Sequence, residues 1–118
     1  MRDKNIWQEQ LLDEIATIAS KSTLADLWSG INPDRISSYE EEVSHIFDDF
    51  EIDAFLLEVG PSLSCEKRGS LENFRKVFWL FTEYADQKFG KQPAFDEILE
   101  DPRWAQVMAA AQRVVDLS

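Results

Sequence analysis

The side chains best suited to catalysis or ligand binding lie close together, in the segment YEEEVSHIFDDFEIDAFLLEVG at residues 39 to 60. This segment contains eight carboxylates and no lysine or arginine: Glu40, Glu41, Glu42, Asp48, Asp49, Glu51, Asp53 and Glu58. Carboxylates grouped in this way can hold a metal ion, act as general acids or bases, or attract a cationic partner. The neighbouring residue types decide which of these chemistries the segment supports.

A calcium loop is the first possibility, because Asp49, Glu51 and Asp53 alternate as the first ligands of an EF-hand do. Such a loop then needs a glycine at its turn and a bidentate glutamate at its last position. Those two positions are occupied here by Ala54 and Gly60. We therefore do not expect calcium binding.

The pair Glu42 and His45 has the Glu-x-x-His spacing of di-iron helical bundles, which combine two such pairs with two further glutamates. His45 is the single histidine of the chain, and its helical phase predicts that it projects outward. One histidine and one cysteine also fall short of the usual structural zinc site. We expect no metal site and no cofactor.

Catalytic constellations are equally short of residues. A Ser-His-Asp arrangement would depend on His45, and the four glycines form no nucleotide-binding fingerprint. The cations Lys67 and Arg68 could activate the nearby Cys65, although a plain loop cysteine is the favoured interpretation. Carboxylates on a helix face open to water lack the desolvation that general-acid catalysis needs. We expect a protein that is not an enzyme.

The composition predicts one folded domain over residues 1–118. The chain is 44% hydrophobic and has 8 Phe, 4 Trp and 2 Tyr, which is enough material for a core. The single cysteine favours the reducing cytoplasm, and we recognise neither a signal peptide nor a membrane-spanning run. A net charge of −11 opposes direct binding to nucleic acid or anionic lipid, because like charges repel, and it favours a basic protein partner.

Helical periodicity along the whole chain predicts an all-α fold, a compact bundle of about five to seven helices. Apolar residues recur at helical spacing over residues 6–19. Ser22 or Thr23 is predicted to cap a second, short helix that ends at Gly30. The pair Asn32-Pro33 suggests an isolated helical turn after it.

The acidic segment is predicted to begin with a capping box, because Ser38 stands three residues before Glu41. Its apolar stripe shifts in phase near Glu51, which indicates a bend or break there. Residues 54–59 could form a buried strand by propensity, but the sequence offers no second strand to pair with them. Gly60-Pro61 is expected to end the segment.

The second half of the chain is predicted to contain the longest helix, at residues 71–89, capped by Ser70 after a loop at 61–69. Because this helix is apolar on nearly every side, we expect the other helices to enclose it at the centre of the domain. A short helix is expected from Pro93, and a last one from Asp101-Pro102.

The charge is concentrated on one face of the predicted acidic helix. Residues 40 to 60 carry −8 of the net −11. On a helical projection the apolar residues Val43, Ile46, Phe47 and Phe50 lie opposite a polar face made of Glu41, Glu42, His45, Asp48 and Asp49. Two interpretations remain open: a solvated helix face, and a surface for a cationic partner that relieves the self-repulsion of the carboxylates.

An acidic, cysteine-poor helical chain with a cluster such as EEEVSHIFDDFEID resembles the bacterial immunity proteins that neutralise nuclease toxins. The likeness concerns the character of the whole chain, so no family residues are carried over. It implies a cytoplasmic inhibitor that binds a basic toxin domain and covers its substrate groove or a nearby exosite.

The residues expected to contact this partner are Tyr39, Glu40, Glu41, Glu42, Asp48, Asp49, Glu51 and Asp53. Tyr39 and Trp79 are candidate aromatic anchors, because tight binding needs a desolvated apolar contact near the charges. The alternative function is a helical adaptor or regulatory subunit that binds a peptide or helix through an apolar groove. The sequence leaves the oligomeric state open.

Overall fold

The computed structural model describes residues 3–31, 33–34, 36–90 and 94–118. These ranges contain helices and turns but no strand, which confirms the all-α class. In chain order the elements are α1 (Lys4–Ala19), α2 (Lys21–Ser29), α3 (Tyr39–Ser44), a π-helical turn η1 (His45–Asp49), α4 (Ile52–Glu58), a 3-10 turn η2 (Gly60–Ser62), α5 (Cys65–Lys88), α6 (Phe95–Leu99) and α7 (Pro102–Leu117). None of the described helices has the length and apolar character that crossing a membrane requires.

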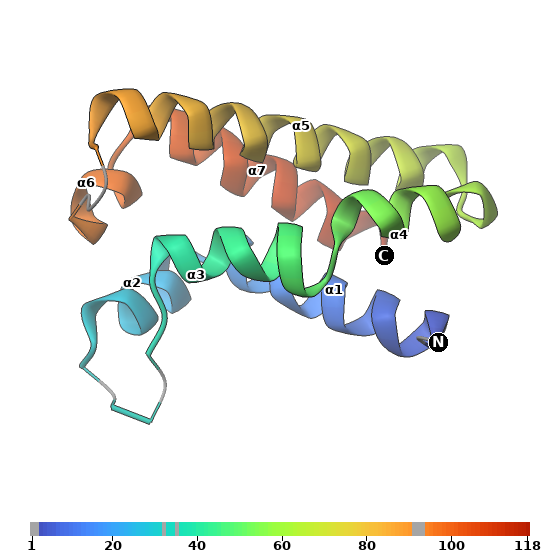
Figure 1. The fold of residues 1–118 in the computed structure, drawn as a ribbon, viewed down its shortest axis with the longest axis horizontal. Helices are drawn as coiled ribbons and strands as arrows, with labels where there is room; N and C mark the ends of the chain where they lie inside the picture. The colour runs from blue at the N-terminus through green and yellow to red at the C-terminus, as the bar shows by residue number, and fades with distance from the viewer. Residues whose placement is uncertain (1–2, 32, 35, 91–93) are drawn as a thin grey trace.

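The long helices set the shape of the molecule (Figure 1). α5 and α7 lie along each other, and α7 also packs against α1. The α3–η1–α4 segment runs beside α1 and contacts α5 through α4. α2 and α6 pack together at one end of the molecule, while the start of α1 and the end of α7 lie toward the other.

Trp104 lies at the centre of an aromatic core. Its side chain is fully buried, and its ring centroid lies between 5.1 and 6.1 Å from those of four other rings, Phe81, Trp28, Phe78 and Tyr39. These rings come from α2, α3 and α5, whereas Trp104 belongs to α7. One side chain therefore joins four helices.

The start of α2 differs from the prediction. Ser20, rather than Ser22 or Thr23, is the N-cap, and its hydroxyl oxygen accepts a hydrogen bond from the Thr23 backbone N–H at 3.3 Å. Ser20 directly follows the end of α1, so the same residue is the boundary of both helices. Gly30 ends α2 with a φ of 73°, which confirms the predicted left-handed stop.

α5 begins earlier than predicted. The Ser64 hydroxyl oxygen accepts a hydrogen bond from the Lys67 backbone N–H at 3.2 Å, so the predicted loop at 61–69 is helical from residue 65 onward. Ser70, the predicted cap, lies inside the helix and donates its hydroxyl to the Lys67 carbonyl at 2.8 Å. Two serines offered the same signal, and the earlier one forms the cap.

Two other predicted helix starts are confirmed, because the side chains of Ser38 and Asp101 cap α3 and α7. The turn predicted at Asn32 and the helix start predicted at Pro93 involve residues outside the described ranges. Residues 54–59, the possible strand, belong to α4 and the turn that follows it.

The expectation that α5 is enclosed on all sides is wrong. The helix packs against α7 and α4, and its side chains Phe74 and Phe78 are fully buried. Its opposite side is open, since Trp79 is 42% and Leu80 53% exposed. α5 is therefore a surface helix that presents apolar side chains outward.

The break predicted near Glu51 is confirmed. In the π turn the Phe50 backbone N–H donates to the His45 carbonyl at 2.8 Å, and Glu51 follows in a left-handed conformation with a φ of 47°. The Trp7 indole donates to the Phe50 carbonyl at 2.6 Å and so satisfies a backbone group at the break. The acidic segment is consequently two short helices rather than one.

Replacing Glu51 with glycine should stabilise the fold relative to replacing it with alanine. A left-handed conformation costs a residue with a Cβ about 1–2 kcal/mol, and the greater freedom of glycine in the unfolded chain offsets part of this difference. We expect Glu51→Gly to exceed Glu51→Ala in free energy of unfolding by about 1 kcal/mol, measured by urea denaturation. Both variants remove the same carboxylate, so equal stabilities would contradict the strain argument.

Candidate functional site

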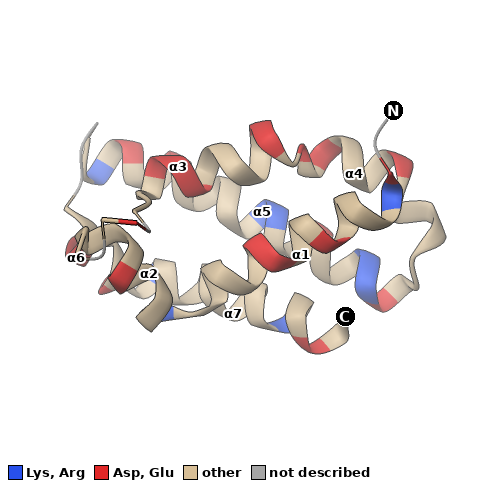
Figure 2. Ribbon diagram, turned by 90° about the horizontal axis from the view of Figure 1, so that it is seen from below, with Lys and Arg blue, Asp and Glu red and all other residues tan. Residues whose placement is uncertain are grey.

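Six of the predicted contact residues are exposed and form what we call the acidic row: Glu40, Glu41, Asp48, Asp49, Glu51 and Asp53. Figure 2 shows acidic positions following the ribbon from α3 to α4. Asp53 pairs with Arg75, with 2.8 Å between Oδ1 and Nε. Within the described residues, Glu40, Glu41 and Asp48 have no lysine or arginine partner. These three charges are therefore left to solvent or to a partner.

A surface groove lies beside the acidic row, between α3 and α5. Glu40 and Asp86 line it together with Trp79 and Tyr39. Tyr39 is only 8% exposed, because its ring belongs to the aromatic core, whereas Trp79 is 42% exposed. Burial, with Asp86 and Glu40 nearby, raises the pKa of Tyr39 above its usual value. Of the two candidate anchors, Trp79 is the one that presents its ring to solvent.

Arg75 links the acidic row to this groove. Its guanidinium donates to both carboxylate oxygens of Asp53, at 2.8 and 3.4 Å. The same guanidinium lies 5.8 Å from the ring centroid of Trp79 and 5.9 Å from that of Phe47. The arginine thus satisfies a carboxylate and an aromatic face at once.

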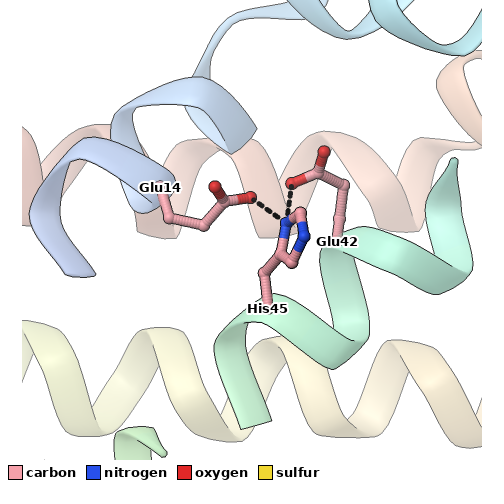
Figure 3. Close-up of side chains that lie close together, drawn as sticks. All are labelled: Glu14, Glu42 and His45. Carbon is pink, nitrogen blue, oxygen red and sulfur yellow. Dashed lines mark hydrogen bonds and ion pairs between the residues drawn. The ribbon is translucent and has the colours of Figure 1, made fainter. Parts of the chain in front are cut away.

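A further polar cluster, which sequence reasoning missed, lies between α1 and the α3–η1 segment (Figure 3). Glu14 of α1 and Glu42 of α3 both turn toward His45. The His45 Nδ1 lies 3.4 Å from Glu14 Oε1 and 3.9 Å from Glu42 Oε2. We call these three side chains the Glu–Glu–His cluster.

Two sequence predictions are corrected by this cluster. Glu42 is 2% exposed, so its placement on the exposed face with the acidic row is wrong. His45, expected to project outward, is partly buried and faces two glutamates. Glu42 stands three residues after Tyr39 and four before Ile46, which are both buried, so helical phase puts it on the inner side.

The Glu42 carboxyl lies in an unusual environment for an acid. The Ser37 hydroxyl donates to its Oε1, while its Oε2 accepts no hydrogen bond from the described residues. Desolvation by burial raises the pKa of Glu42 to about 8; the nearby Glu14 carboxyl adds to this effect and the Ser37 hydroxyl opposes it. Within the described residues neither glutamate pairs with a lysine or arginine.

Comparisons of the chain with protein-family models, with curated proteins and with solved structures find no match. Two features of the described residues bear on its function: the exposed acidic row with its groove, and the Glu–Glu–His cluster.

The sequence did contain a signal for Glu14. This residue lies three positions after Leu11 and four before Ile18, and both of those side chains are fully buried. A carboxylate at that phase of an amphipathic helix faces the core rather than water. A partly buried acid turned toward the core needs a compensating group, so its position alone points to a polar cluster there.

Proposed function

We propose that this chain is an acidic binding protein that neutralises a basic protein partner. The partner we propose is a nuclease-type toxin domain, with the acidic row covering its substrate groove or a nearby exosite. The observation that carries the proposal is the exposed acidic row, in which Glu40, Glu41 and Asp48 have no cationic partner among the described residues. The class-level likeness to immunity proteins supports the choice of toxin.

The electrostatics favour such a partner. A nuclease surface is basic because its substrate is polyanionic, so closely spaced carboxylates attract it over several ångströms and speed the encounter. Like charges left unpaired repel one another, by a few tenths of a kcal/mol for each adjacent helical pair. A cationic partner removes this repulsion when it binds.

The groove between α3 and α5 supplies the apolar contact that charges alone do not provide. Trp79 exposes part of its ring there, with the carboxylates of Glu40 and Asp86 beside it. An aromatic side chain flanked by acids suits a lysine or arginine, whose stem packs on the ring while its charge meets the carboxylates. We propose that Trp79 is the anchor of the complex.

The test measures the association rate with a basic partner recovered on the immobilised chain from its native host. The association rate should fall by at least about tenfold as the salt concentration is raised. The triple variant Glu40→Gln, Glu41→Gln, Asp48→Asn should associate about tenfold more slowly at low salt and respond less to salt. The matched control is Glu66→Gln, Glu97→Gln, Asp116→Asn, which removes three exposed carboxylates from α5, α6 and α7.

Both triple variants change the net charge by the same amount, so a difference between them reports the location of the charge. An association rate indifferent to salt, or slowed equally in both variants, would overturn the proposed role of the acidic row. A cleavage assay then tests whether the purified partner cuts DNA or RNA and whether this chain inhibits that cleavage.

An adaptor function is the second candidate, favoured by a groove between α5 and α7. Val77, Leu80 and Phe81 line this groove, and Leu80 is 53% exposed. A peptide or helix bound there would be held by apolar contacts. That complex should be insensitive to salt and weakened by Leu80→Ser, whereas the acidic-row variant should bind normally.

A further inference from the structure

The Glu–Glu–His cluster has the dimensions of a metal site. One ligand atom from each of Glu14, Glu42 and His45 lies within 4.8 Å of the other two. The His45 Nδ1 is 3.4 Å from a Glu14 oxygen and 3.9 Å from a Glu42 oxygen. A tetrahedral zinc ion with bonds of about 2.0–2.2 Å spaces its ligand atoms about 3.4 Å apart. The two distances from His45 are close to this value.

A separate observation points to a cation at this place. Glu42 is 2% exposed, and its Oε2 is directed at His45 while accepting no hydrogen bond from the described residues. The other oxygen is already held by the Ser37 hydroxyl. A buried carboxylate oxygen without a donor is costly, so it requires a proton or a positive charge.

We propose that Glu14, Glu42 and His45 bind one divalent transition-metal ion of the zinc class. Two carboxylates and a neutral imidazole carry a charge of −2, which a single divalent ion neutralises. Imidazole with carboxylates suits zinc, whereas calcium takes six to eight oxygen ligands and magnesium keeps most of its waters. The ion joins α1 to the α3–η1 segment, which carries most of the acidic row.

The surroundings of His45 fit this assignment. Asp49 Oδ2 lies 3.8 Å from the His45 Nε2, on the side of the ring away from the two glutamates. A carboxylate near the second nitrogen favours the tautomer that leaves Nδ1 free to bind a metal. The His45 side chain is 35% exposed, which gives an ion and a water ligand access from solvent.

The competing arrangement is a proton shared by the two glutamates, with His45 nearby. Titration calorimetry with Zn²⁺, and with Mg²⁺ and Ca²⁺ as comparisons, separates the two. We expect one Zn²⁺ per chain and a higher melting temperature with Zn²⁺. His45→Gln and Glu14→Gln should each weaken Zn²⁺ binding by about tenfold or more.

Asp13→Asn and Glu41→Gln are the matched controls, because each removes an exposed carboxylate next to the cluster. Both should leave the Zn²⁺ affinity unchanged. Co²⁺ gives a second readout, since the visible spectrum of the Co²⁺ complex should change in His45→Gln but not in the controls. Circular dichroism checks that each variant is folded. Because Glu14 and His45 are only partly buried, we expect their replacement to leave the fold intact.

Absence of Zn²⁺ binding would overturn the proposal in favour of the shared proton. Zn²⁺ binding that all the variants retain equally would also overturn it, because the ion would then be held by surface carboxylates. Neither result depends on the acidic row having a partner, so failure here leaves the proposed function untouched.

Discussion

Replacing Trp104 with alanine should lower the free energy of unfolding by about 3–5 kcal/mol. Trp104 is fully buried and touches rings from three other helices, so its removal leaves a cavity where α2, α3, α5 and α7 meet. A domain of this size is stable by only about 5–15 kcal/mol, so much of that margin would be lost. Urea denaturation followed by circular dichroism measures the change.

Trp104→Phe is the matched control. The indole N–H of Trp104 has no hydrogen-bond acceptor among the described residues, so phenylalanine loses ring area but no polar contact. We expect it to cost less than about 1.5 kcal/mol. If phenylalanine and alanine were equally destabilising, the ring contacts would not be the source of the effect.

The second large effect concerns pH. Because the folded chain raises the pKa of Glu42 to about 8 from the ordinary value of 4.5, the folded state keeps a proton that the unfolded state releases between these pH values. The unfolded state binds fewer protons in this window, so the stability contributed by protonated Glu42 falls as pH rises. The full contribution is present below about pH 4.5 and is lost through about pH 8.

Glu42→Gln should remove this pH dependence. Glutamine keeps the shape and the oxygen that accepts the Ser37 hydroxyl, but it carries no titrating proton. With a chelator present, the free energy of unfolding of the variant should rise relative to that of the parent chain as the pH increases. The expected change is up to about 1.4 kcal/mol per pH unit. The measurement is the free energy of unfolding of both proteins from pH 4 to 9.

Glu41→Gln is the control for this experiment, since Glu41 is the adjacent exposed carboxylate. The difference in free energy of unfolding between Glu41→Gln and the parent chain should stay nearly constant across the same pH range. A constant difference for Glu42→Gln as well would show that Glu42 ionises in the folded state as it does in the unfolded chain.

The predicted fold was confirmed where a local rule had one solution. Gly30 and Asp101 were each the only suitable residue at their helix ends, and both act as predicted. Where two residues satisfied the same rule, as Ser64 and Ser70 did, the sequence offered no way to choose, because capping depends on which turn the packing holds in place. The surface position of α5 was missed because it depends on how many neighbours the bundle provides.

Only part of the candidate site could be predicted from the sequence. The exposure of Glu40, Glu41 and Asp48 followed from composition and periodicity. The inward direction of Glu42 did not, because it follows from the burial of Tyr39 three residues earlier, which depends on packing against Phe81 of α5 and Trp104 of α7. Glu14 is 28 positions from Glu42 in sequence, so only the packing of α1 against η1 brings the two together.

Arg75 has a consequence for any complex formed at the groove. Its guanidinium already sits near the face of Trp79 and on the carboxylate of Asp53, which is where an arginine of a basic partner would bind. If Trp79 anchors a basic partner as proposed, Arg75 competes within the chain for that contact. Such a partner would have to displace this arginine or approach Trp79 from the groove side, so the strength of the Arg75 contacts would set a minimum strength for any competing arginine.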